Sequence, residues 1–350
     1  MEQRTRALVA SAFIGLIFLL VQLGALALVQ PFEAAGYQAV EDPSDPTNTV
    51  VYVAAILIAT GLMLLAIKLD VDQLIRAFVV FAGVYLSWYV FSVVVPSVYT
   101  YAGFNVLAVA AALALGAALL LYPEWYVIDA SGVVMGAGAA GLFGISFGLL
   151  PAILLLAVLA IYDAISVYGT EHMLTLASGV MDLKVPVVLV VPLTLSYSFL
   201  SAETPDPTGE VEGEAAANGG DPESEAEADG ADDEDDGTDD PADGEPMDRD
   251  ALFIGLGDAV IPTVLVASAA FFAPASVPTV GLLGLVVPLT ALGAMVGTFL
   301  GLALLLRMVL EGRAHAGLPL LNGGVIGGYL VGALASGLPI LEALGLAGFL

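Results

Sequence analysis

A succession of nine long apolar runs constrains this chain more than any other feature of its sequence. The first run, 7–29, is long enough for a helix to cross the roughly 30 Å hydrocarbon core of a bilayer. With 59% hydrophobic and 13% charged residues, most of the chain cannot form a water-soluble domain. We therefore predict an all-α, nine-span bundle in the cell membrane. The runs cover 7–29, 50–67, 74–95, 104–121, 133–150, 151–168, 251–272, 280–306 and about 320–337.

Two apolar segments allow a second interpretation. Run 7–29 could be a cleaved signal peptide, but the apolar core of a signal peptide usually has only about 7–15 residues, so we expect a retained span. Residues 185–200 could form a tenth span, but Pro186 and Pro192 interrupt them. We expect this segment to lie at the cytoplasmic face as a helix or an extended strand.

The basic residues predict the orientation of the spans, because Lys and Arg are enriched in cytoplasmic flanks. With nine spans and a cytoplasmic N-terminus, all eight basic residues fall on the cytoplasmic side. The C-terminus then lies outside. Inserting residues 185–200 as a tenth span would move three arginines to the outer side, against this rule.

The net charge of −28 is concentrated in one segment. Residues 203–250 hold 21 of the 36 acidic residues and a single basic one, which excludes a basic nucleic-acid-binding face. Segment 201–248 has almost no large apolar side chains, so we expect a disordered cytoplasmic loop. It divides the chain into membrane halves 1–200 and 249–350. The excess of acid and the scarcity of lysine suit a halophile with a cytoplasm of very high salt concentration.

Two aspartates, Asp163 and Asp258, lie inside apolar runs. An ionised side chain in hydrocarbon costs about 2.5–3.5 kcal/mol on insertion scales, so such an aspartate indicates function. If the sixth run continues to about residue 174, both lie roughly 12–15 Å below the cytoplasmic surface. Two facing carboxyls cannot both ionise cheaply, so we expect the pair to share a proton and activate water for peptide hydrolysis. Gly255 and Gly257 would let a substrate backbone or the sixth span come close.

Other chemistry is less well supported by the composition. The chain has no cysteine and only two histidines, so disulfides, thiol nucleophiles and histidine clusters are excluded, and we expect no cofactor or metal. The alternatives that remain are a proton-coupled transporter, with the two aspartates as a relay, and a non-catalytic membrane scaffold. We expect Glu124 and Asp129 to lie on a solvated face after the fourth span. The charged residues expected to flank spans are Glu171, His172, Asp182, Lys184 and His315.

Small residues recur every four positions in three of the runs. Because lipid supplies no hydrophobic drive between helices, such stripes indicate close helix packing. The stripes are Gly132, Gly136, Ala140, Gly144 and Gly148; Gly293, Gly297 and Gly301; and Gly324, Gly328 and Gly332.

The motifs, in this order, resemble the presenilin and signal peptide peptidase family of intramembrane aspartyl proteases. The resemblance covers nearly the whole chain apart from the acidic segment. It is carried by Tyr162-Asp163 in the sixth run, Gly255-Leu256-Gly257-Asp258 in the seventh, nine spans, the long hydrophilic segment between these motifs, and Gly317-Leu318-Pro319-Leu320-Leu321 before the ninth run.

The resemblance implies a catalytic pair, Asp163 and Asp258. It implies supporting roles for Tyr162, Gly255, Leu256 and Gly257, and a substrate-binding role for Pro319, Leu320 and Leu321. These last three match the family's Pro-Ala-Leu motif, with Leu320 in place of alanine. The resemblance further implies an archaeal-type enzyme that works as a single chain, without accessory subunits, on transmembrane helices or signal-peptide remnants that unwind locally.

Overall fold

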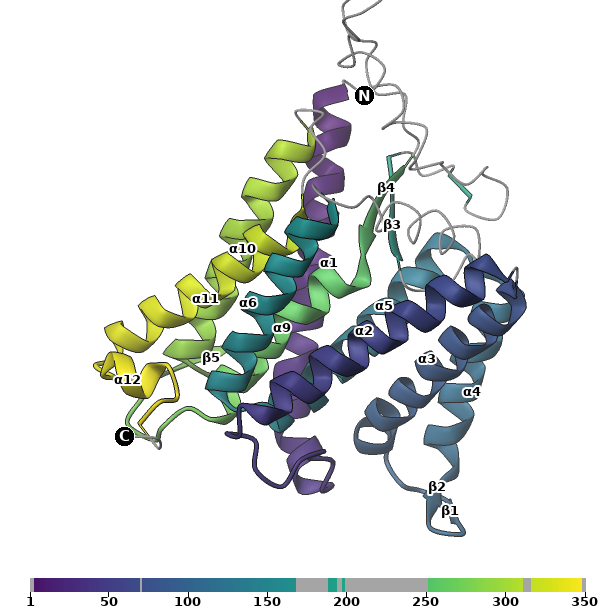
Figure 1. The fold of residues 1–350 in the computed structure, drawn as a ribbon. Helices are drawn as coiled ribbons and strands as arrows, with labels where there is room; N and C mark the ends of the chain where they lie inside the picture. Colours follow the sequence, from purple (N-terminus) through teal and green to yellow (C-terminus); the bar gives the residue numbers. More distant parts are fainter. Residues whose placement is uncertain are drawn as a thin grey trace, which may run out of the picture.

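The computed structural model describes residues 3–69, 71–167, 188–193, 197–198, 251–310 and 316–347, most of which are helical (Figure 1). The helices are α1 Gln3–Ala34, α2 Thr47–Lys68, α3 Asp72–Val94, α4 Val106–Leu121, α5 Trp125–Ser146, α6 Leu149–Ile165, α9 Leu256–Phe271, α10 Leu289–Leu310, α11 Gly317–Ala335 and α12 Ile340–Ala343. The strands are β1 Thr100–Tyr101, β2 Phe104–Asn105, β3 Val188–Pro192, β4 Ala251–Gly255, β5 Thr279–Leu282 and β6 Leu285–Pro288.

Six of these helices are long and apolar enough to cross a membrane: α1, α2, α3, α5, α10 and α11. Helices α4, α6 and α9 are shorter but also apolar. The protein is therefore a membrane-embedded, multi-pass protein, whereas the count of nine spans and the orientation of the termini stay predictions. The start of α1, the end of α2, the start of α3 and the end of α10 lie at the same end of the bundle (Figure 1). These are the helix ends that carry the described basic residues.

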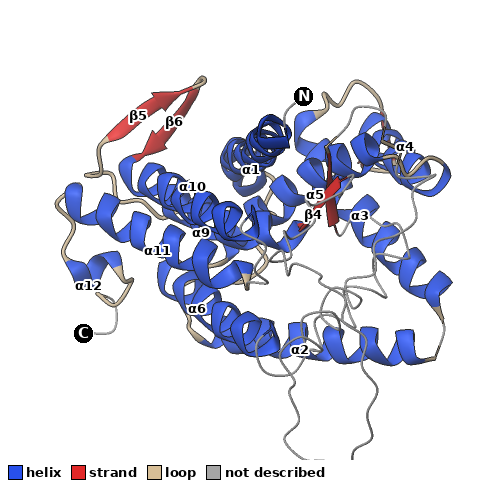
Figure 2. Cartoon of the chain, turned by 90° about the horizontal axis from the view of Figure 1, so that it is seen from above, coloured by secondary structure: helices blue, strands red, loops and turns tan. Residues whose placement is uncertain are grey.

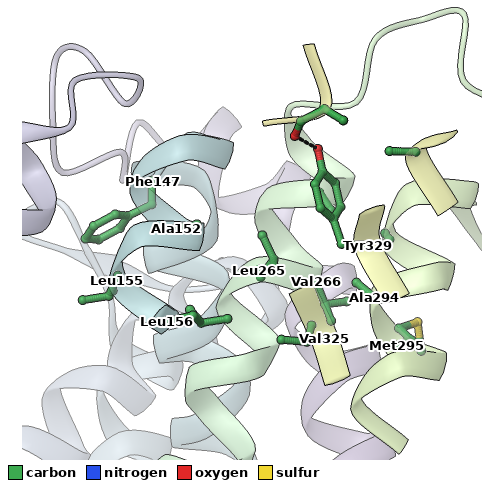
Figure 3. Close-up of a cluster of buried hydrophobic side chains, with 14 of the residues drawn as sticks. Phe147, Ala152, Leu155, Leu156, Leu265, Val266, Ala294, Met295, Val325 and Tyr329 are labelled. Carbon is green, nitrogen blue, oxygen red and sulfur yellow. Dashed lines mark hydrogen bonds between the residues drawn. The ribbon is translucent and has the colours of Figure 1, made fainter. Parts of the chain in front are cut away.

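Helix α9 lies at the centre of the bundle, where α1, α5, α6, α10 and α11 pack around it (Figure 2). A helix that is apolar on all sides is expected in such a position. In the largest core cluster, Leu156 of α6 and Leu265 of α9 are fully buried (Figure 3). The same cluster includes Tyr329 of α11, whose hydroxyl donates a hydrogen bond of 2.6 Å to the carbonyl oxygen of Ala343 (Figure 3).

The glycine stripes of α10 and α11 mark a close contact between these two helices, as the sequence predicts. On α10, a Cβ at Gly301 would lie 2.5 Å from the carbonyl oxygen of Leu320 on α11. Gly297 and Gly324 face each other in the same way, each against the other's carbonyl oxygen. At these positions any side chain would force α10 and α11 apart, so the two helices pack backbone against backbone.

Three of the predicted runs begin with strands, which corrects the helix starts inferred from sequence. The eighth run, 280–306, begins with the hairpin β5–β6, and α10 starts only at Leu289. The hairpin turns through Leu283 and Gly284, both with positive φ (49° and 87°), the backbone geometry of tight two-residue turns. The fourth run likewise begins with β2, whose hairpin turns through Ala102 and Gly103.

The third such run is the seventh, 251–272, which begins with strand β4 and is not a continuous helix. Its first five residues pair with β3 in an antiparallel ladder that runs from Val188 opposite Gly255 to Pro192 opposite Ala251. The segment considered as a tenth span is thus extended over 188–192. This ladder joins the parts of the chain that precede and follow the acidic segment. The predicted loop 201–248, the continuation of the sixth span and the five charged flanking residues lie outside the described residues.

Candidate active site

Asp163 lies in the last turn of α6, inside the bundle. Its side chain is 7% exposed, and its Oδ2 accepts a hydrogen bond of 3.0 Å from the backbone N–H of Leu318. The apolar sequence of α6 packs this helix against α9 and α11, which turns the aspartate towards the start of α11. The carboxyl thus lies where a second helix supplies a polar partner.

Asp258 lies in the first turn of α9, directly after β4. An acidic side chain is favourable at this end of a helix because the first N–H groups give the end a partial positive charge. Four residues later stands Pro262, which lacks an N–H and cannot donate the helical hydrogen bond to the carbonyl of Asp258. The first turn of α9, which contains Asp258, therefore has one backbone hydrogen bond fewer than that of a regular helix.

The start of α11 brings the two carboxyls together. A Cβ built on Gly317 would lie 3.5 Å from Oδ2 of Asp258, and the next residue, Leu318, donates to Asp163. One peptide unit of α11 therefore lies against both aspartates, one from α6 and one from α9.

Comparison with known proteins identifies the family of this chain. A family model described as "Signal-peptide peptidase, presenilin aspartyl protease" matches residues 15–338. The chain belongs to this family. No curated protein matches the sequence.

Solved structures of presenilin family members have a similar fold. A presenilin family intramembrane aspartate protease solved in space group C222 is 30% identical, with a TM-score of 0.59, and the match covers 93% of this chain and 99% of that chain. A structure in space group P2 with the same description is also 30% identical, with a TM-score of 0.56 and coverage of 92% and 96%.

The first turn of α11 has the features of a helix end that binds anions. The N–H groups of a first turn have no acceptor within their own helix, and Asp163 accepts that of Leu318. Pro319, the third residue of α11, lacks an N–H, so it adds no further unsatisfied donor there. The positive end of the α11 dipole thus faces the carboxyl pair.

Buried contacts fix the position of this helix end. Asn322 of α11 is fully buried and donates a hydrogen bond of 2.9 Å from Nδ2 to the carbonyl oxygen of Leu156 on α6. Leu321 is fully buried in a cluster with Leu302 and Leu305 of α10. Together with the backbone packing of Leu320, these contacts hold α11 against both α6 and α10.

The other residues implied by the family resemblance lie around the pair in different ways. Tyr162 is half-buried, and its hydroxyl has no hydrogen bond within the described part of the chain. A Cβ on Gly255 would lie 3.5 Å from Oδ2 of Asp258, whereas one on Gly257 would meet, among the described residues, only Ile261 at 3.8 Å. Helix α6 therefore does not approach either glycine closely. Leu256 instead packs towards α5.

Sequence reasoning missed the backbone of Gly317 and Leu318 as part of the site, because a backbone N–H leaves no signature in side-chain chemistry. It was also wrong about Glu124 and Asp129, which are buried (7% and 4% exposed) and not solvated. Helix α5 begins at Trp125, eight residues before the predicted run, and carries Asp129 into the interior. Within the described ranges, no three His, Cys, Asp or Glu side chains are grouped as metal ligands.

Proposed function

We propose that this protein is an intramembrane aspartic endopeptidase of the GxGD type, with Asp163 and Asp258 as its catalytic pair. The observation that carries the proposal is the peptide unit Gly317-Leu318, which lies against both carboxyls in a chain of this family. Two acidic side chains from different helices are costly to bury in a membrane protein, so their meeting at one point favours a shared chemical role.

Peptide hydrolysis by this pair requires one shared proton. The ionised carboxylate takes a proton from a water molecule while the water oxygen bonds to the carbonyl carbon, and the protonated carboxyl donates to the carbonyl oxygen. In the second step the C–N bond breaks, the leaving nitrogen takes the proton of one carboxyl, and a hydroxyl of the tetrahedral intermediate gives its proton to the other carboxylate. The carboxyls end with the single proton with which they began. No covalent intermediate with the protein is formed, because the oxygen that attacks the carbonyl carbon belongs to water.

The surrounding residues have supporting roles in this scheme. The positive end of the α11 dipole stabilises negative charge on the pair while the proton moves. Gly257 gives a substrate backbone room to approach, since among the described residues only Cδ1 of Ile261, at 3.8 Å, lies near a Cβ built there. Tyr162, Gly255 and Leu256 support the pair on α6 and at the start of α9. Pro319 and Leu320 contact the substrate, whereas Leu321, which is fully buried against α10, fixes the start of α11.

We infer that the substrates are transmembrane segments of membrane proteins or signal peptides in the cell membrane. A helix in lipid has all its backbone hydrogen bonds made, so the scissile segment must unwind before a carbonyl reaches the pair. The protein would act as a single chain, without accessory subunits, at the high salt that its acidic composition suits.

The test is cleavage of a labelled single-span substrate by the purified protein in lipid at high salt. Asp163→Asn and Asp258→Asn keep the shape of the side chains but remove the carboxyl chemistry, and the exposed loop variant Asp45→Asn is the matched control. We expect cleavage by the parent and the control, and none by the two active-site variants when all four are folded. Equal behaviour of all four over several substrates would contradict the proposal, and proton flux in liposomes would then test the relay.

A further inference from the structure

A buried carboxyl group of α5, Asp129, lies outside the catalytic pair. Its Oδ1 accepts a hydrogen bond of 2.8 Å from the backbone N–H of Val190 in β3. Its Oδ2 is buried and has no partner among the described residues. A half-satisfied carboxyl inside a membrane helix is costly, so the bond to Val190 points to a specific task.

The direction of this bond defines the two edges of β3. In an antiparallel ladder, residues whose N–H points away from the partner strand form the non-hydrogen-bonded pairs. Val190 is therefore opposite Phe253 in such a pair, and the hydrogen-bonded pairs are the ones on either side. Pro192 has the same parity as Val190, so its missing N–H costs no bond to β4. One edge of β3 holds β4, and the other edge is held by α5.

Helix α5 also provides the space in which β3 lies. Gly132 follows Asp129 by one turn on the same face of α5, and a Cβ on it would lie 2.8 Å from Cδ2 of Leu189 in β3. Asp129 thus anchors the strand, and Gly132 makes room for its side chain. A shift of β3 along α5 would break the hydrogen bond from Val190 to Asp129 and, at the same time, remove the fit of Leu189 against Gly132.

The β3–β4 strand pair connects the anchor at Asp129 to Asp258 of the catalytic pair. Strand β4 ends at Gly255, opposite Val188, and α9 begins at the next residue. Leu256 contacts the same face of α5, with Cδ1 at 3.3 Å from a Cβ built on Gly136. Asp258 follows two residues later, so no flexible connection separates it from the sheet.

We propose that Asp129 is a positioning residue, which holds β3–β4 on α5 and thereby sets the position of Asp258 relative to Asp163. This inference rests on the proposed protease function for its effect on rate, but its effect on the sheet is independent of that function. A displacement of about 1 Å in a catalytic group can cost on the order of 100-fold in rate. A partly released sheet is therefore expected to lower kcat by about tenfold or more.

The experiment compares Asp129→Leu with Asp129→Asn, two side chains of similar shape of which only the amide can accept from Val190. Ser131→Ala is the matched control, because the Ser131 hydroxyl bonds only carbonyls of its own helix, Val127 and Ile128. We expect Asp129→Leu to lower kcat about tenfold with KM changed less than twofold, and Asp129→Asn and Ser131→Ala to stay within about twofold of the parent. Asp129→Ala repeats the comparison if the leucine variant does not fold.

Hydrogen–deuterium exchange supplies the readout that a general structural role would not give. Loss of the anchor should speed exchange in peptides that cover 188–192 and 251–255 and leave α10 and α11 unchanged. Parental kcat and exchange in Asp129→Leu, or equal loss in the asparagine and leucine variants, would overturn the proposal. If the parent cleaves no substrate, the protease function fails, and a selective change in sheet exchange still supports the anchor.

Discussion

Replacing Gly317 by alanine should separate catalysis from folding at the site. The new methyl group would lie 3.5 Å from Oδ2 of Asp258 and 3.4 Å from Cδ2 of Leu305. These are ordinary van der Waals distances, and the backbone of Gly317 does not have a positive φ, so the variant should fold without strain. The methyl group would nevertheless fill space directly beside the carboxyl of Asp258, which we propose to be catalytic.

The expected magnitudes differ for rate and stability. A methyl group takes up about as much room as one water molecule, whose share of liquid volume is about 30 Å³. If the attacking water or the scissile carbonyl uses this space, a displacement of about 1 Å lowers kcat on the order of 100-fold, or about 2.7 kcal/mol in activation free energy. The free energy of unfolding should change by less than about 1 kcal/mol, the range of glycine-to-alanine effects in helices.

The assay is the cleavage of a labelled single-span substrate, with thermal unfolding measured on the same samples. Gly323→Ala is the control, since Gly323 is exposed on the same helix and a Cβ there would have nothing within 4 Å. Parental cleavage by Gly317→Ala would refute the assignment of this space to water or substrate. Equal losses in both variants would attribute the effect to stiffening of α11 and not to the site.

Three further substitutions test other parts of the structure. Gly297→Ala would place a methyl group against the carbonyl oxygen of Gly324, so it should lower the free energy of unfolding by about 1–3 kcal/mol, measured by denaturation in detergent. Tyr329→Phe removes the hydrogen bond to the carbonyl oxygen of Ala343 in α12 and should cost about 0.5–1.5 kcal/mol in the same assay while kcat stays unchanged. The backbone N–H of Thr47 holds the pKa of Asp45 below its ordinary value of 3.8. The parent should therefore have a higher free energy of unfolding than Asp45→Asn at pH 7, and this difference should vanish as the pH falls below about 4.

The apolar runs predicted the helices well but not the strands. A continuous apolar stretch such as Ala251–Gly255 fits a helix and a buried strand equally, because it has no periodicity of its own. Its state is decided by pairing with Val188–Pro192, which lies across the acidic segment. The tight turns were hidden for a related reason, since Ala102-Gly103 and Leu283-Gly284 lack the asparagine or aspartate that usually marks such turns.

Those parts of the candidate site that consist of side chains could be predicted from the sequence. The cost of an aspartate in an apolar run singles out Asp163 and Asp258. The hydrogen bond from the backbone N–H of Leu318 to Asp163 could not be predicted from the sequence, because every residue but proline has the same backbone N–H. Asp129 was misplaced because Gly132 and its neighbours weaken the apolar signal of α5 near its start, so the helix was predicted to begin too late.

The backbone packing of α10 on α11 has a consequence for how the site responds to heat. Two membrane helices are already helical before they dock, so docking through Gly293, Gly297 and Gly301 orders almost no backbone, and glycine has no side-chain rotamers to lose. An interface of leucines would give up rotamer entropy, and that cost grows with temperature. The attachment of α11, and with it the peptide unit beside the two carboxyls, should therefore weaken less on warming than contacts formed by long side chains elsewhere in the bundle.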